Sequence, residues 1–172
     1  MIGVGLLMGI LAWVAAAAEA ATPTAAEAAA AYDRLKALNG DWEGKSTKGW
    51  TDRVQVKTIA AGSVVVFDSF DAHPNEEMLT TFAPDGDRLL LTHYCVARNQ
   101  PRLVLSAVEN EGRRLTFTFL DGGNLPSRDR GHMDSLVLDF PEPGRFTERW
   151  TWYQDGKESF MEEIEMRRAS GP

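Results

Sequence analysis

The stretch Arg53–Ala60, RVQVKTIA, alternates apolar and polar side chains from one residue to the next. Val54 and Val56 fall on one side of such a segment, while Arg53 and Lys57 fall on the other. A period of two residues is typical of a β-strand that buries one face and exposes the other. The stretch therefore predicts a strand, and the same period dominates most of the remaining chain.

Similar runs recur at short intervals, separated by segments rich in Gly, Pro, Asn and Asp that favour turns. We predict ten strands, at residues 42–48, 53–60, 63–71, 76–83, 88–97, 102–109, 113–120, 131–140, 145–154 and 157–168. Because the connections are short, consecutive strands are expected to pair as neighbours. The predicted fold is therefore all-β, an antiparallel up-and-down barrel of about ten strands, which exposes no sheet edge. About eight strands already enclose an interior that side chains can just fill, so this strand number predicts a cavity.

The first forty residues do not follow this period. Residues 1–20 hold an apolar run that ends in Ala18-Glu19-Ala20, a pattern typical of a secretory signal peptide. Residues 21–40 predict a helix, because Thr24 and Glu27 fit a capping box and Asn39-Gly40 favours a stop. We therefore predict a signal peptide at 1–20, a helix within 21–40 and a barrel domain at 41–170. An uncleaved membrane anchor is the alternative for the first segment.

Composition narrows the possible partners and the compartment. The formal net charge is -7, and no run of Lys or Arg is present, so we expect no binding to nucleic acid. With a cleaved signal peptide, the protein is expected to be periplasmic or secreted, with no stable membrane span after processing. Cys95 is the single cysteine of the sequence and cannot form a disulfide within the chain.

The segment LNGDWEG at 38–44 resembles the Gly-x-Trp signature that opens the first strand of calycins, the group of lipocalins and fatty-acid-binding proteins. This resemblance implies that Trp42 closes one barrel end and stacks on a basic residue of the last strands. Arg149, Arg167 and Arg168 are candidates, and the last two are better placed. The strand number resembles that of nitrobindin-like haem proteins. The stretches LTHYC…NQPR, GHMDS and ERWTWYQDGKE resemble an uncharacterised family of bacterial secreted lipocalin-like proteins.

Two predicted strands carry apolar runs that end in polar residues able to bind a ligand. On the strand at 88–97, His93 and Cys95 share a face with two leucines; on the strand at 131–140, His132 and Asp134 share a face with two more. We expect both runs to line the cavity near its mouth, beside walls of aromatic residues and a rim turn at 99–102. The candidate ligand-binding residues are His93, Cys95, Arg102, Phe117, Phe119, His132, Asp134, Trp150 and Trp152.

Three functions are consistent with these residues. The first, which we favour, is non-catalytic binding of an apolar or amphipathic small molecule, whose polar group meets the histidines and Arg102. The second is a haem or metal site on His93 or His132, with Cys95 as a soft ligand. The third is a structural or interaction module whose barrel is filled by side chains. His93 and Cys95 lie about 7 Å apart along a strand, which disfavours one ion bound by both strands.

Catalysis is the weaker expectation. Cys95 with His93 or His132 could form a thiolate–imidazole pair, but the sequence contains no nucleophile elbow or phosphate-binding loop. Glu148, set among tryptophans, would have a raised pKa if it pointed inward. A single carboxylate of this kind is more often structural, so no catalytic residue and no required cofactor are predicted.

Overall fold

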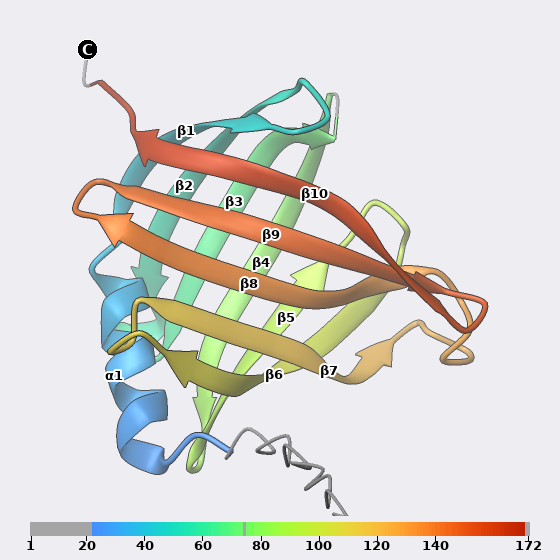
Figure 1. The fold of residues 1–172 in the computed structure, drawn as a ribbon, viewed down its shortest axis with the longest axis horizontal. Coiled ribbons are helices and arrows are strands. Elements are labelled where there is room, and N and C mark those ends of the chain that lie inside the picture. The colour runs from blue at the N-terminus through green and yellow to red at the C-terminus, as the bar shows by residue number, and fades with distance from the viewer. Residues whose placement is uncertain (1–21, 74, 171–172) are drawn as a thin grey trace, which may run out of the picture.

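The computed structural model describes residues 22–73 and 75–170, with the side chains of Asp71 and Ala72 excepted. The predicted signal peptide lies outside the described residues. Within them, helix α1 (Ala25–Lys36) precedes an all-β barrel (Figure 1). No helix in the described part of the chain is both long and apolar enough to cross a membrane.

The capping box predicted for the helix is present. The hydroxyl of Thr24 accepts a hydrogen bond from the backbone N–H of Glu27 at 3.3 Å, and the Glu27 carboxylate accepts one from the backbone N–H of Thr24 at 2.8 Å. Four helix residues face the barrel and are buried: Ala28, Ala31, Tyr32 and Leu35. The amphipathic face of α1 therefore packs on the barrel.

Ten strands form the wall of the barrel within the described residues. Their bounds are β1 (Gly40–Ser46), β2 (Thr51–Ile59), β3 (Val64–His73), β4 (Glu76–Asp85), β5 (Arg88–Tyr94), β6 (Gln100–Glu109), β7 (Arg114–Gly123), β8 (His132–Glu142), β9 (Arg145–Gln154) and β10 (Lys157–Arg168). Every strand pairs antiparallel with its neighbours in sequence, and β1 pairs with β10, where Trp42 lies opposite Arg168. The predicted closed up-and-down barrel is confirmed.

Most predicted strands differ from the observed ones by up to three residues at an end, and the difference that matters most for the site lies between β5 and β6. β5 ends at Tyr94, and a tight turn follows in which Arg98 N–H donates to the Cys95 carbonyl and Cys95 N–H donates to the Asn99 carbonyl. Cys95 therefore lies in the turn instead of on the strand with His93. The segment that we predicted as a rim turn, 99–102, is mostly the start of β6, where Pro101 lies opposite Gly122 of β7.

Register shifts break the alternation near the ends of β8 and β10. On β8 the shift lies between Met133 and Ser135, so three consecutive residues, His132, Met133 and Asp134, are all buried. On β10 the shift lies between Phe160 and Glu162, which leaves Phe160 half exposed and buries Glu162. Alternation with Ile164 and Met166 would place Phe160 on the inner wall, but the extra residue of the bulge turns it outward.

Aromatic rings fill the barrel interior at the end nearest α1. Phe67 packs against Phe82 with ring centroids 5.0 Å apart, and Phe82 packs against Phe117 at 5.5 Å. Trp42 packs against Phe146 at 4.7 Å. We call these five rings the ring core. Because they are almost fully buried and in mutual contact, this half of the interior is filled by side chains, and the strand number alone does not leave a cavity there.

Helix α1 and Arg168 close this same end. The Tyr32 hydroxyl donates to the Gly62 carbonyl at 2.8 Å, and the Arg34 guanidinium lies 5.3 Å from the centroid of the Phe140 ring, so the helix reaches from the β2–β3 turn to β8. The Arg168 guanidinium lies 4.5 Å from the centroid of the Trp42 ring and donates to the Asn39 carbonyl at 2.6 Å. The β5–β6, β7–β8 and β9–β10 connections, which include the long segment 124–131, lie at the opposite end (Figure 1).

Candidate functional site

A connected set of polar side chains lies inside the barrel beyond the ring core. Ser46 ends β1, Asp52 begins the inner face of β2, and His93 lies near the end of β5, so the set belongs to the half away from α1. We call it the inner polar layer, and its members are Ser46, Asp52, Thr80, His93, Glu148, Trp150 and Glu162. Each is at most 7% exposed. Burying so many polar groups costs free energy unless each has a partner.

His93 is held in place through one ring nitrogen only. Its Nδ1 lies 2.9 Å from the Thr80 hydroxyl, and its ring centroid lies 4.9 Å from that of Trp150. Its Nε2 is buried and has no hydrogen-bond partner among the described residues. Burial lowers the pKa of His93 to about 4, so the imidazole is neutral at physiological pH. The site thus presents an oriented, neutral imidazole with one nitrogen available.

Glu148, like His93, contacts Trp150. Its Oε2 accepts a hydrogen bond from the Trp150 indole at 3.2 Å, while its Oε1 is buried without a partner in the described part of the chain. Burial, followed by the nearby charge of Asp52, raises the pKa of Glu148 to about 8. Glu148 is therefore largely protonated at neutral pH and can donate a hydrogen bond to a partner or lose its proton to one.

Glu162 and Ser46 complete the layer on the β1–β10 side. The Ser46 hydroxyl donates to the Glu162 carboxylate, and burial raises the pKa of Glu162. Lys48 and His73 partly oppose this rise. The layer is thus rich in carboxyl groups, and among the described residues no buried side chain is a lysine or an arginine.

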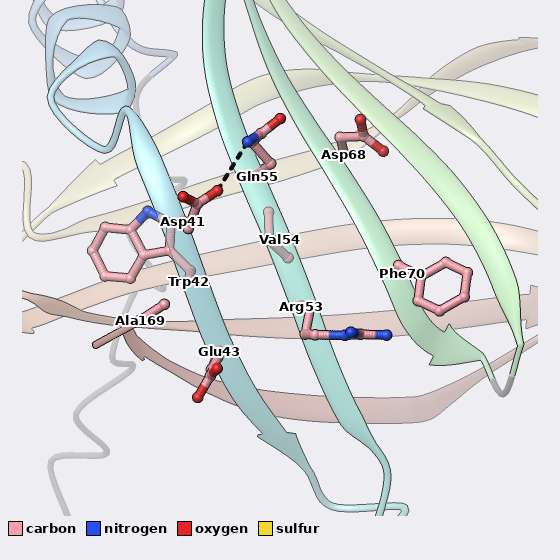
Figure 2. A pocket seen from close by; sticks show the side chains of 9 residues that line it. All are labelled: Asp41, Trp42, Glu43, Arg53, Val54, Gln55, Asp68, Phe70 and Ala169. Carbon is pink, nitrogen blue, oxygen red and sulfur yellow. Dashed lines mark hydrogen bonds between the residues drawn. The ribbon is translucent and has the colours of Figure 1, made fainter. Parts of the chain in front are cut away.

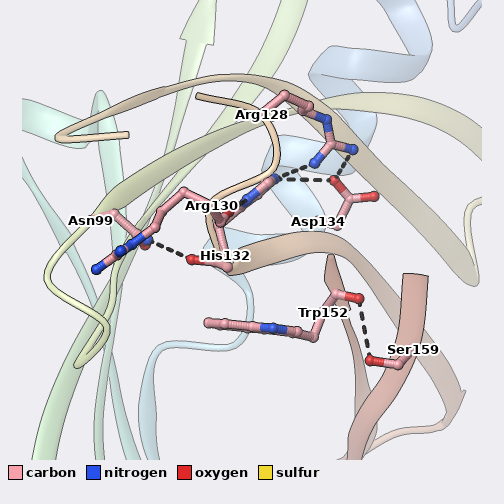
Figure 3. Close-up of polar contacts among 8 residues, drawn as sticks. Asn99, Arg128, Arg130, His132, Asp134, Trp152 and Ser159 are labelled. Atoms are coloured by element: carbon pink, nitrogen blue, oxygen red, sulfur yellow. Dashed lines mark hydrogen bonds and ion pairs between the residues drawn. The ribbon is translucent and has the colours of Figure 1, made fainter. Parts of the chain in front are cut away.

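A second group of side chains lies at the start of β8, near the mouth of the barrel (Figure 3). The Arg128 guanidinium contacts Asp134 Oδ1 at 2.5 Å and also contacts His132 Nε2. It lies 3.6 Å from the ring centroid of Tyr153 and 4.3 Å from that of Phe119. We call these five residues the rim cluster. Arg128 is therefore a cation held between two rings and a carboxylate, with its charge already neutralised.

His132 differs from His93 because both of its ring nitrogens are occupied. Nε2 contacts Arg128, and Nδ1 contacts the Arg130 carbonyl. Its ring is fully buried, with its centroid 4.6 Å from that of Phe119. His132 accordingly organises the rim cluster and has no nitrogen left for a ligand or a metal.

Two connections next to the rim cluster are tied to each other. The Asn99 side chain donates to the Gly131 carbonyl at 2.8 Å (Figure 3), and the Asn124 side chain donates to the Arg98 carbonyl. These bonds join the β5–β6 turn to the β7–β8 segment. They hold in place the turn that directly follows the strand bearing His93.

The structure distributes the predicted ligand-binding residues over several places. His93 and Trp150 belong to the inner polar layer, while Phe119, His132 and Asp134 belong to the rim cluster. Trp152 is half-buried beside Gly131, and its indole donates to Gln154 at 3.3 Å. Phe117 is part of the ring core.

Two predicted site residues do not join the polar groups. Arg102 projects from the outer face of β6, where it pairs through two contacts with Asp121, because it alternates with the buried Pro101 and Leu103. Cys95 is half-buried in its turn, and burial raises the pKa of its thiol, which makes it a poor nucleophile. The predicted roles of Arg102 at the rim and Cys95 beside His93 are therefore not supported.

Sequence reasoning missed four residues of the inner polar layer. Asp52 shares its parity with Val54 and was missed because β2 begins at Thr51, two residues earlier than predicted. Thr80 and Ser46 follow the parity of the buried residues on β4 and β1, so alternation could have identified them. Glu162 shares the parity of the buried Ile164 and Met166 on β10, so the same alternation could have identified it.

The surface also carries hollows, which lie away from the inner polar layer. One of about 560 Å³ lies over β1, β2 and β3, among exposed residues that include Asp41, Arg53 and Phe70 (Figure 2). Asp41 accepts a hydrogen bond there from Gln55 at 2.9 Å. Another, of about 640 Å³, lies beside α1 and Arg168. Neither is lined by His93 or Glu148, so neither is continuous with the candidate site.

Comparisons with known proteins leave the family open. No protein-family model matches the chain, and no curated protein matches it. Within the described residues, no group of three or more His, Cys, Asp or Glu side chains is arranged to hold a metal ion. The closed ten-stranded barrel and the helix α1 that precedes it are consistent with a calycin-like fold.

Proposed function

We propose that this chain is an exported, non-catalytic, calycin-type protein that binds an amphipathic small molecule inside the barrel. The observation that carries the proposal is the pair of unpartnered buried atoms, His93 Nε2 and Glu148 Oε1, in two residues that both contact Trp150. Buried polar atoms without partners are uncommon in folded proteins and call for an explanation such as a bound molecule. A ligand's polar group would satisfy both atoms.

The apolar part of such a ligand would lie toward the mouth. Met133 and Trp152 lie opposite each other on β8 and β9, one step beyond Trp150, and both pack against the hydrophobic core. Since the ring core fills the half nearest α1, the ligand would enter from the other end, past the rim cluster. Affinity would come mainly from these apolar and aromatic walls, and orientation from the inner polar layer.

A displacement experiment tests this function. The protein is purified after expression with its leader and titrated with Nile red, a neutral lipophilic dye, which is then displaced with decanol. We expect saturable binding that weakens about tenfold in His93→Leu, because the variant removes a polar partner, and that is unchanged in Arg102→Ala, whose side chain lies outside. Absence of saturable dye binding, together with no ligand in native mass spectrometry, would contradict the proposal and favour a filled, structural barrel.

Haem binding is a second candidate that rests on His93 alone. Its neutral imidazole, oriented through Nδ1 and available at Nε2, suits an axial ligand. The surrounding groups do not suit haem, because its propionates need cationic partners and no buried side chain among the described residues is a lysine or an arginine. Haem titration followed at the Soret band should therefore leave the spectrum of free haem. A shifted band lost in His93→Ala and kept in His132→Ala would reverse the order of the two candidates.

A further inference from the structure

Resting on the proposed function, we propose that the polar group recognised by the inner polar layer is a cation, and that the ligand is an amphipathic organic amine. The inner polar layer holds three carboxyl groups, those of Asp52, Glu148 and Glu162. Asp52 and Glu162 are both close enough to Glu148 to act on its charge, and all three are at most 5% exposed. An anionic head group would find no buried lysine or arginine to pair with among the described residues, whereas a cationic one would meet carboxyl groups.

The two unpartnered atoms are suited to an ammonium group. An ammonium carries hydrogen-bond donors only, and it would require acceptors at both positions. Glu148 Oε1 is such an acceptor once its carboxyl is ionised. His93 Nε2 is an acceptor in the tautomer in which Nδ1–H donates to the Thr80 hydroxyl.

The Trp150 ring provides a third element of cation recognition. It contacts His93, with ring centroids 4.9 Å apart, and its indole donates a hydrogen bond to Glu148. A cation beside an indole face is stabilised by the ring quadrupole, more so when it is desolvated. By contrast, a metal ion does not fit this layer. Among the described residues, no group of three or more His, Cys, Asp or Glu side chains is arranged to hold one.

Binding of an amine should be coupled to proton release from Glu148. The carboxyl is largely protonated at pH 7 in the free protein. When an ammonium enters, the O–H bond of Glu148 breaks, the proton passes to the buffer, and the carboxylate pairs with the cation. The charged groups that face Glu148 in this process are Asp52 from β2 and Glu162 from β10, with Lys48 and His73 acting on Glu162.

The test compares three ligands of equal chain length, decylamine, decanol and decanoate, each below its critical micelle concentration, by isothermal titration calorimetry. We expect decylamine to bind about tenfold more tightly than decanol, and decanoate more weakly than either. The heat of amine binding should depend on the ionisation enthalpy of the buffer, which reports the proton released. Decanol should show no such dependence.

Glu148→Gln is the decisive variant, and Glu165→Gln is its matched control, because Glu165 is an exposed residue of the neighbouring strand β10. Glu148→Gln should abolish both the preference for the amine and the proton release, while Glu165→Gln should preserve both. Thermal unfolding checks that both variants are folded. If decanol or decanoate binds as tightly as decylamine, or if Glu148→Gln keeps the preference, the amine proposal is overturned while small-molecule binding stands. If none of the three binds, both proposals fail.

Discussion

The two halves of the barrel interior are built on opposite principles. In the half nearest α1, the ring core packs aromatic side chains against one another with centroids 4.7–6.0 Å apart, and the polar atoms at its edge are satisfied, such as the Trp42 indole, which donates to the Leu38 carbonyl at 2.7 Å. In the other half, the inner polar layer buries carboxyl groups and an imidazole, and His93 Nε2 and Glu148 Oε1 have no hydrogen-bond partner among the described residues.

This difference assigns stability to one half of the interior, the ring core, and the candidate ligand site to the other half, the inner polar layer. The ring core is stable without a bound ligand, because burial of aromatic rings is favourable by itself. The inner polar layer lowers stability, and an apolar substitution of similar size would be expected to relieve that cost. Locally unfavourable arrangements of this kind are expected at functional sites, which is why we place the ligand there.

The largest effect should come from removing a ring of the ring core. Phe82 is fully buried and contacts both Phe67 and Phe117. Phe82→Ala should lower the free energy of unfolding by about 3–5 kcal/mol, because it removes apolar contacts and leaves a cavity. Urea denaturation measures this loss. A decrease below about 1 kcal/mol would show that the two halves do not differ in the way described.

The next effect concerns Glu148 and the pH dependence of stability. Between its unfolded pKa of 4.5 and its folded pKa of about 8, the folded chain keeps a proton that the unfolded chain has lost. Stability should therefore fall as pH rises across this interval. Glu148→Gln should equal the wild type near pH 4 and exceed it by a few kcal/mol near pH 8, as measured by denaturation at several pH values. Parallel curves for the two proteins would refute a buried, protonated Glu148.

His93 should affect the pH dependence of stability less than Glu148 and in the opposite direction. Between its unfolded pKa of 6.5 and its folded pKa of about 4, the unfolded chain binds a proton that the folded chain does not. Stability should therefore fall as pH decreases through this interval. His93→Gln should remove this part of the pH dependence and keep the part due to Glu148. A variant that still loses stability as steeply as the wild type below pH 6.5 would show that His93 is not the buried neutral group.

The smallest effect is expected on the outer face. Arg102 pairs with Asp121, but the two side chains are 46% and 49% exposed, so solvent screens the interaction. Arg102→Ala should lower the free energy of unfolding by less than about 1 kcal/mol and leave Nile red binding unchanged. A marked loss of dye binding would place the site on the outside of the barrel and overturn the comparison between the two interior halves.

Much of the fold could be predicted from the sequence, because period-two alternation and turn residues are local signals. The ten strands, their order and the capped helix follow from them. The ends of the strands could not be predicted, since a bulge such as that at Met133–Ser135 depends on pairing with β9 and leaves no local pattern. This limitation explains the errors at the site, where Cys95 was expected on the strand with His93 and Arg102 was expected at the rim.

The closing pair of strands has a consequence for how the barrel forms. Trp42 and Arg168 face each other across β1 and β10, although almost the whole barrel sequence separates them. Because contacts between distant parts of a chain slow folding, the barrel should fold slowly. The pairing of β1 with β10 can form only after β10 has been synthesised. Until then β1 and β9 present open edges that can pair with other chains. Deletion of β10 should therefore produce aggregation instead of a smaller soluble barrel.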